Sequence, residues 1–239
     1  MLRGGNFPTA YVYPAELRDT RDLLRKRCII VRRRGATITH VQMINHQQNL
    51  PAFEKAIRYK ANRIGIADRF EGDSLQRMVS LDVDLIDFYD KQIQQLDLFL
   101  EQHAKLDDPD TFFRLQSIPG VGRILAMTML YEIHDIKRFP AVGDFLSYSR
   151  LVKGTNSSAG KSYKPTGRKI GNPHLKWAFS EAITLLKREC PQAKAFAEHI
   201  EKKHNKVRVN TLLTIKLGRA VYWMWNRKAA FNPNVFAKD

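Results

Sequence analysis

The sequence predicts an all-α fold: a helical hairpin or coiled coil, followed by a compact helical domain that contains a helix-hairpin-helix motif. Apolar residues recur at spacings of three, four and seven in several segments, which is the period of helices that pack on one side. Stretches containing Pro and Gly interrupt this period and mark the boundaries. Hydrophobic residues make up 44% of the 239 residues, so the chain can bury a normal core.

The chain is strongly basic. It has 40 Lys and Arg residues against 24 Asp and Glu residues, which gives a formal net charge of +16. Such a surplus is costly through self-repulsion and is typical of proteins that bind a polyanion. A membrane partner is disfavoured, because the sequence has no run of about 18 apolar residues and no separate basic amphipathic helix at a terminus. We therefore expect a nucleic-acid partner and no membrane.

The first 13 residues contain Gly, Pro and aromatic residues without a period, and we expect an extended arm there. A helix is predicted from Pro14, where apolar residues follow at helical spacing. It is rich in arginine but contains few acids, so pairing within the helix cannot neutralise it and contact with backbone phosphates is favoured over a solvated face. Its basic residues are Arg18, Arg21, Arg25, Lys26, Arg27, Arg32, Arg33 and Arg34.

Residues 74–105 carry the most regular helical pattern. Their apolar positions alternate between spacings of four and three, a heptad row interrupted by Asp82. Two arrangements fit this row: an antiparallel hairpin with the Arg-rich helix, or a coiled coil that joins copies of the chain into a homo-oligomer. The sequence leaves both open. The row consists of Leu75, Val79, Asp82, Ile86, Tyr89, Ile93, Leu96 and Leu100.

Neither the cysteines nor the acids predict a metal site. Cys28 and Cys190 are far apart and lack the spacing of zinc ligands. Two lone thiols, without a signal peptide at the start, indicate a reducing and therefore cytoplasmic location. Four Asp residues between positions 82 and 90 share one helix, and we expect them on its solvated outer face rather than around a metal ion.

The segment SIPGVG at 117–122 precedes a predicted apolar helix at 124–133. An apolar residue followed by Pro-Gly-apolar-Gly at a helix start is the pattern of a helix-hairpin-helix turn. Gly120 and Gly122 would permit a close backbone approach, and the amides of the following helix would face a phosphate. Arg123 would add a charged contact. The alternative is a tight turn without a ligand, but the basic charge of the chain favours DNA binding.

A long acid-free stretch follows. No Asp or Glu occurs from Phe145 to Ser180, although the chain has 24 acids. A stretch of this length indicates a surface that contacts phosphate. The basic residues within it are Arg150, Lys153, Lys161, Lys164, Arg168, Lys169 and Lys176.

A cluster of small hydroxyl residues, TNSSAGK at 155–161, lies inside this stretch. Either its hydroxyls hydrogen-bond phosphates from a flexible loop, or one serine attacks a phosphodiester while nearby cations stabilise the pentavalent charge. From the residues alone the first interpretation is favoured, because no His or Asp stands beside a serine to act as a base. The order of residues also differs from that of a nucleotide-binding P-loop.

The tail from Pro191 contains a basic segment around residues 202–208 and a predicted apolar helix that includes Trp223 and Trp225. We expect both tryptophans to pack in the core. Stacking on a nucleobase is an alternative without support in the sequence.

Four blocks follow one another: SIPGVGRILAMTML, FPAVGDFLSYSRLV, NSSAGK and TGRKIGNPHLKWAF. In this order and spacing, over about residues 117–179, they resemble the C-terminal domain of the IS116/IS110/IS902 family of insertion-sequence transposases. The flanking helical parts are compatible from about Leu2 to Asn226. Four blocks in the correct order are much more specific than any one of them.

The resemblance implies an enzyme that cuts and rejoins DNA with two half-sites. One is an RNase-H-like domain whose four acids bind divalent metal, and the other is a C-terminal serine that forms a phosphoserine with DNA. A structured guide RNA bridges donor and target. By position Ser158 matches the nucleophile, and Ser157, one residue away, is the alternative. We infer that the basic residues around it contact phosphate.

The family's acidic domain would precede the Arg-rich helix, and this sequence begins almost at that helix. We therefore interpret residues 1–13 as a remnant of that junction, residues 14–106 as the Arg-rich helix plus the coiled-coil helix, and residues 107–239 as the C-terminal transposase domain. The chain itself would bind no cofactor, since the Mg²⁺ of the complete enzyme would belong to the missing domain.

The functional prediction is a truncated DNA transposase or recombinase with a serine nucleophile, inactive by itself, with DNA and a guide RNA as partners. The alternative is a non-catalytic module that binds DNA or RNA and dimerises. A second alternative is a DNA-repair accessory protein that uses the hairpin motif.

Overall fold

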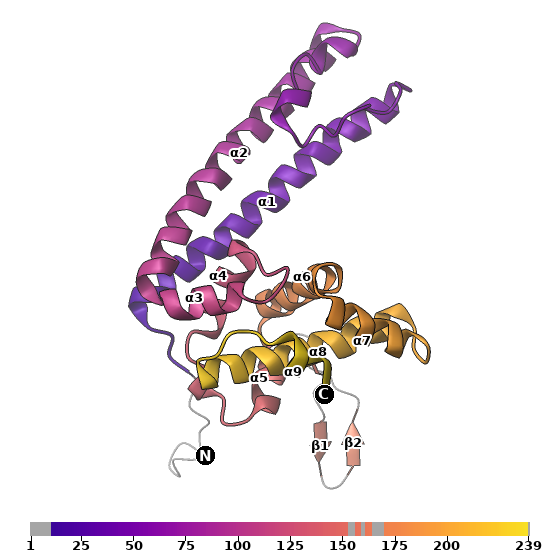
Figure 1. Ribbon diagram of the computed structural model, residues 1–239. Helices are drawn as coiled ribbons and strands as arrows, with labels where there is room; N and C mark the ends of the chain where they lie inside the picture. Colours follow the sequence, from indigo (N-terminus) through magenta and orange to yellow (C-terminus); the bar gives the residue numbers. More distant parts are fainter. Residues whose placement is uncertain (1–10, 153–155, 159–160, 164–169, 239) are drawn as a thin grey trace. The chain divides into compact units, whose positions relative to one another are not determined.

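The computed structural model describes residues 11–152, 156–158, 161–163 and 170–238, without the side chains of 156–158, 161–163 and 238. Helices make up nearly all of the described regular structure, which confirms the predicted all-α fold (Figure 1). Two three-residue strands form a small hairpin. The chain divides into two compact units, residues 22–100 and residues 1–21 with 101–239.

The unit at residues 22–100 is built from two long helices, α1 (Ala15–Gln47) and α2 (Asp73–Asp107), which continue beyond it. The segment between them contains two short 3-10 helices, η2 (Lys60–Asn62) and η3 (Ala67–Arg69). Side-chain hydrogen bonds between the helices join Arg27 to Asp97 and His40 to Asp82, so the residue numbers fall along α2 as they rise along α1. Within this unit the two helices therefore form an antiparallel hairpin, one of the two arrangements left open by the sequence.

The heptad row of α2 contributes to the core of this hairpin. Val79 and Ile86 are completely buried and pack in one cluster with Val41 and Ile44 of α1. The segment between the helices adds Ile57, Ile66 and Phe70 to the same cluster. Burying apolar side chains from three segments is the main stabilisation available to two helices that would be marginal alone.

The acids of α2 correct the prediction of a solvated outer face. Asp82 binds His40, and Asp90 binds Arg34 of α1. Arg63, from the segment between the helices, bonds to both Asp87 and Asp90 at 2.5 Å. Asp84 is exposed as expected. Sequence spacing placed these acids on one helix, but it could not show that their partners lie 24 to 56 residues away in the sequence.

The remaining unit is a cluster of shorter helices. They are α3 (Pro109–Gln116), α4 (Arg123–Ile133), α5 (Val142–Tyr148), α6 (Pro173–Glu189), α7 (Pro191–Glu201), α8 (Lys206–Arg227) and α9 (Pro233–Lys238), with the 3-10 turn η4 (Ile136–Arg138). Helix α4 lies at the centre: every residue from Leu125 to Ile133 is buried, and the helix packs on α3 and α6. Helix α6 in turn packs on α7 and α8.

Local sequence explains where several of these helices begin. Asp108 and Asn172 precede α3 and α6, and each side chain accepts a hydrogen bond from a backbone amide of the first turn. A proline follows each cap at the first helical position, where its missing N–H costs nothing. Asn205 caps α8 in the same way through the amide of Arg208. None of the described helices is long and apolar enough to span a membrane.

Candidate nucleic-acid interface

The serine pair lies in the small hairpin. Strand β1 (Asn156–Ser158) pairs antiparallel with β2 (Lys161–Tyr163), and the register sets Ser158 opposite Lys161 and Ser157 opposite Ser162. The backbone therefore brings the expected nucleophile and one expected phosphate contact to the same rung of the ladder. Two residues separate the strands, the commonest length for a hairpin connection. The expected contacts Lys153, Lys164, Arg168 and Lys169 lie outside the described residues.

The two chain segments that lead into and out of this hairpin are held together at its base. The amide of Asn172 donates to the carbonyl of Tyr148 at 2.6 Å. The Nε of Arg150 donates to the carbonyls of Ile170 and Gly171 at 3.0 and 2.9 Å. Arg150, expected as a phosphate contact, thus has its Nε engaged with backbone at the hairpin base.

Glycine is required at position 171. Its φ is +91°, a region that other residues rarely adopt, and a Cβ there would lie 2.6 Å from the carbonyl oxygen of Tyr148. The close approach of the two backbones at the base therefore depends on the absence of a side chain.

Two buried polar residues, Glu132 and Asn172, support the same base, and sequence reasoning missed both. The Asn172 Oδ1 accepts from the amides of His174 and Leu175, which caps α6. Its Nδ2 donates to Glu132 Oε2 at 2.7 Å and lies 3.3 Å from the Tyr148 hydroxyl. A carboxyl group in the otherwise apolar helix α4 needs such a partner, because burying an unpaired charge is costly. That glutamate, and the Asn-Pro start of α6, were the available signals in the sequence.

Arg138 contacts both the base of the serine hairpin and the chain segment before α1. Its guanidinium lies over the rings of Tyr11 and Tyr148, at 4.3 and 4.5 Å from their centroids. The Tyr11 hydroxyl hydrogen-bonds His134 Nδ1, and burial lowers the pKa of that imidazole. Tyr13 donates to the carbonyl of Tyr131. Residues 11–13 thus contact the same side of the unit as the hairpin base.

The turn between α3 and α4 contains the predicted helix-hairpin-helix glycines. Gly120 has φ +83°, and a Cβ there would approach the carbonyl carbon of Leu185 to 2.8 Å, so this glycine allows the turn to pack on α6. Gly122 is exposed at the start of α4 and has open space around its Cα. Arg123 forms an ion pair with Glu101 at 2.8 Å, although half of its side chain remains exposed.

Further candidates are exposed near the start of α6. Lys176 and Trp177 lie in its first two turns, and Ile170, just before Gly171, is 78% exposed. Across the described residues, no three His, Cys, Asp or Glu side chains gather as metal ligands. The arrangement can present cations and backbone amides to a phosphate, and the strand register sets a serine opposite a lysine in the backbone ladder.

Comparison with known proteins gives one family match. Residues 113–198 match the model described as Transposase IS116/IS110/IS902 family, which confirms the resemblance for this C-terminal part of the chain. The matched range contains the PGVG turn, the serine hairpin and its base. It supports DNA transposition as the process and DNA as the partner at the level of the family. A search of curated proteins gave no significant match.

Proposed function

We propose that this chain, whose residues 113–198 match the IS116/IS110/IS902 transposases, supplies the serine half of an active site that cleaves and rejoins DNA. The observation that carries the proposal is the strand register, which pairs Ser158 with Lys161 in the backbone ladder of the hairpin. Positioning a nucleophile and a cation together against a phosphate supplies a large part of catalysis.

The proposed step is a transesterification. The Ser158 oxygen bonds to phosphorus and loses its proton to a base, one ester P–O bond breaks, and the departing strand end takes up a proton as a hydroxyl. Negative charge builds up on the non-bridging oxygens, and the cations of the acid-free stretch would stabilise it. In this proposal the Mg²⁺ of the complete enzyme belongs to the acidic domain of the family.

The test compares adjacent serines. The chain is incubated with Mg²⁺ and element-end DNA, with and without an RNase-H-like acidic domain of the family in trans, and protein–DNA adducts are separated on denaturing gels. We expect an adduct only when the acidic domain is present. Ser158→Ala should abolish it, and Ser157→Ala should leave it intact, because the proposal assigns the attacking oxygen to Ser158.

Each other outcome has a defined meaning. Loss of the adduct in Ser157→Ala alone would move the nucleophile to Ser157, and an adduct that persists in both variants would overturn the serine mechanism. Strand transfer by the chain without the acidic domain would contradict the division of the active site. DNA binding without any adduct, even with the acidic domain, would favour the non-catalytic binding module.

A second apolar row on α2 supports a homo-oligomer. The predicted heptad row contributes to the core of the hairpin, but Met78, Leu81, Leu85, Phe88 and Phe99 are 39–55% exposed at heptad spacing. In an antiparallel pair of α2 helices centred near Phe88, Asp84 of one copy would face Lys91 of the other. We propose this row as the dimer contact, with a guide RNA as a further partner of the assembled enzyme.

Light scattering tests the dimer. Leu85→Glu with Phe88→Glu should convert it to a monomer. Met43→Glu, a charge placed at an equally exposed apolar position on α1, should leave the mass unchanged. A wild-type chain that is monomeric at all concentrations would refute this contact without affecting the serine mechanism.

A further inference from the structure

The C-terminal end of the sequence contains a second acid-free stretch, beyond the range of the family match. From residue 202 to residue 238 there is no Asp or Glu, while nine Lys and Arg residues occur. The matched range ends at residue 198. Helix α8 occupies most of this stretch, so its whole length is without acids.

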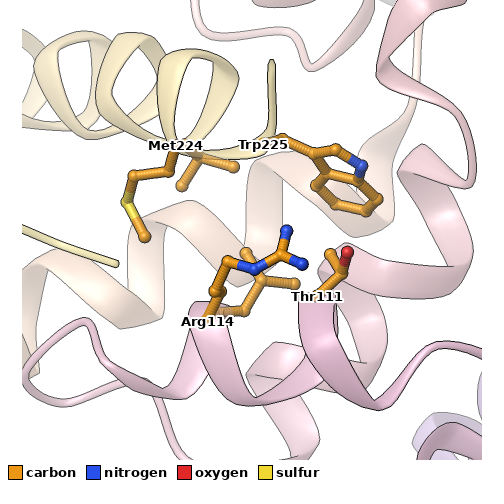
Figure 2. Close-up of a pocket in the computed structure, with 6 residues that line it drawn as sticks. Thr111, Arg114, Met224 and Trp225 are labelled. Atoms are coloured by element: carbon orange, nitrogen blue, oxygen red, sulfur yellow. The ribbon is translucent and has the colours of Figure 1, made fainter. Parts of the chain in front are cut away.

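The two tryptophans of helix α8, Trp223 and Trp225, lie on different faces of the helix. Val221 and Met224 are buried, and Trp225 turns towards α3, where it lines a small pocket with Thr111 and Arg114 (Figure 2). Trp223 is 46% exposed, which corrects the prediction that both tryptophans pack in the core. Tryptophan residues are on average highly buried, so the exposure of Trp223 is not explained by packing alone.

The neighbours of Trp223 orient its ring and place positive charge beside it. The Arg227 guanidinium lies 4.9 Å from the ring centroid, and the edge-on ring of Tyr222 lies at 5.2 Å. The Tyr222 hydroxyl is itself anchored to the carbonyl of Phe139. Arg219, one helical turn before Trp223, is also exposed. Spacings of four residues put Arg219, Trp223 and Arg227 on one face of the helix.

We propose that this face of α8 is a second nucleic-acid contact that binds an unpaired strand, with a base stacked on Trp223 and phosphates bound by Arg219 and Arg227. An exposed indole with one guanidinium over its ring and a second arginine one helical turn away matches the two chemical features of a single strand, a base with an accessible π-face and a charged phosphate. A duplex hides its base faces, so it offers only the phosphates. The proposal rests on the proposed function in one respect, that the chain handles nucleic acid.

The experiment measures the affinity of the full chain for labelled oligothymidylate, oligouridylate and a duplex of equal length by fluorescence anisotropy over a range of salt concentrations. Trp223→Ala should weaken binding of the single strands about tenfold and that of the duplex much less. Trp223→Phe should recover most of the loss, because it keeps a flat ring. The two single strands show whether the unpaired partner is DNA or RNA.

The salt dependence separates stacking from charge. Arg219→Gln should lower the slope of log affinity against log salt by about 0.7 for single strands, the value for one phosphate contact, whereas Trp223→Ala should leave the slope unchanged. Melting curves check that each variant is folded, as expected for residues at the surface.

The matched control is Tyr59→Ala. Tyr59 is 56% exposed, and the Arg58 guanidinium lies over its ring at the same 4.9 Å. Its surroundings differ, because residues 54–73 contain four acids against five basic residues. Binding by the wild type together with equal affinities for Trp223→Ala and Tyr59→Ala would overturn the α8 contact and leave the proposed function standing. A wild-type chain that binds none of the three probes would overturn both.

Discussion

The two compact units use their positive charge differently. Residues 22–100 carry 13 Lys and Arg residues and 10 Asp and Glu residues, so this unit contributes +3 to the formal net charge of +16. The other unit carries the remaining +13. Yet the densest arginine run of the sequence is in helix α1 of the helical hairpin, where Arg27 and Arg34 bind acids of α2. A basic run in the sequence can therefore serve the fold, because two of its arginines bind acids of the facing helix.

The largest expected effect tests whether the hairpin arginines are structural. Arg63 has a side chain only 2% exposed and binds Asp87, Asp90 and the carbonyls of Ile57 and Arg58. Arg63→Ala should lower the free energy of unfolding by about 3 kcal/mol, because it removes the buried cation that bridges Asp87 and Asp90 and takes away the donor to the Ile57 carbonyl. Chemical denaturation measures this.

Its control is Lys60→Ala, since Lys60 is 80% exposed and 4.0 Å from Asp87. This change should cost less than about 0.5 kcal/mol. If Arg63→Ala costs as little as Lys60→Ala, the cations of residues 22–100 do not stabilise the fold. The contrast in how the two units use positive charge would then disappear.

A smaller effect is expected at the base of the serine hairpin. Gly171→Ala forces a side chain into a φ of +91° and against the Tyr148 carbonyl, so we expect a loss of about 2 kcal/mol in a thermal melt. Gly143→Ala, in α5 with open space around it, should be neutral or slightly stabilising. An unchanged melting temperature for Gly171→Ala would show that the two backbone segments at the base can move apart without loss of stability.

The smallest effect concerns a surface pair. Hydrogen bonds from Lys105 and Arg123 lower the pKa of Glu101. A carboxyl with a lowered pKa stabilises the fold above its ordinary pKa, and this contribution is lost as the pH falls through the lowered value. Arg123→Gln should move the Glu101 titration, followed by NMR, back towards its ordinary pKa, with about 0.5 kcal/mol lost at neutral pH. An unchanged titration would mean that Arg123 faces solvent or a ligand instead of Glu101.

Helical periodicity predicted the fold class and the row of α2 that enters the core of the helical hairpin. The Pro-Gly motif predicted the turn at residues 117–122. Periodicity did not identify the partners of the acids, because the side chains bound by Asp82 and Asp90 come from distant segments. The two tryptophans show a signal that was present but unused. Residues two apart on a helix point about 200° apart, so Trp223 and Trp225 could not both face one core.

For the candidate site, the order and spacing of the four sequence blocks pointed to the serines. The residues that hold the flanking segments together could not be predicted from the sequence. Glu132 and Asn172 are 40 residues apart, and only the packing of α4 against the start of α6 brings them within 2.7 Å. Gly120 was assigned to phosphate binding from its motif, whereas its conformation also serves the approach of the turn to Leu185. A short motif gives the local backbone shape but not what lies against it.

The closed base of the serine hairpin also bears on how the protein can change. The segments that flank this insertion are joined by backbone contacts and by the Nε of Arg150. Lengthening a loop whose ends are already held together is inexpensive, about 0.6 kcal/mol for each doubling. Extra residues inserted between these two segments should therefore cost the folding of the supporting helices little.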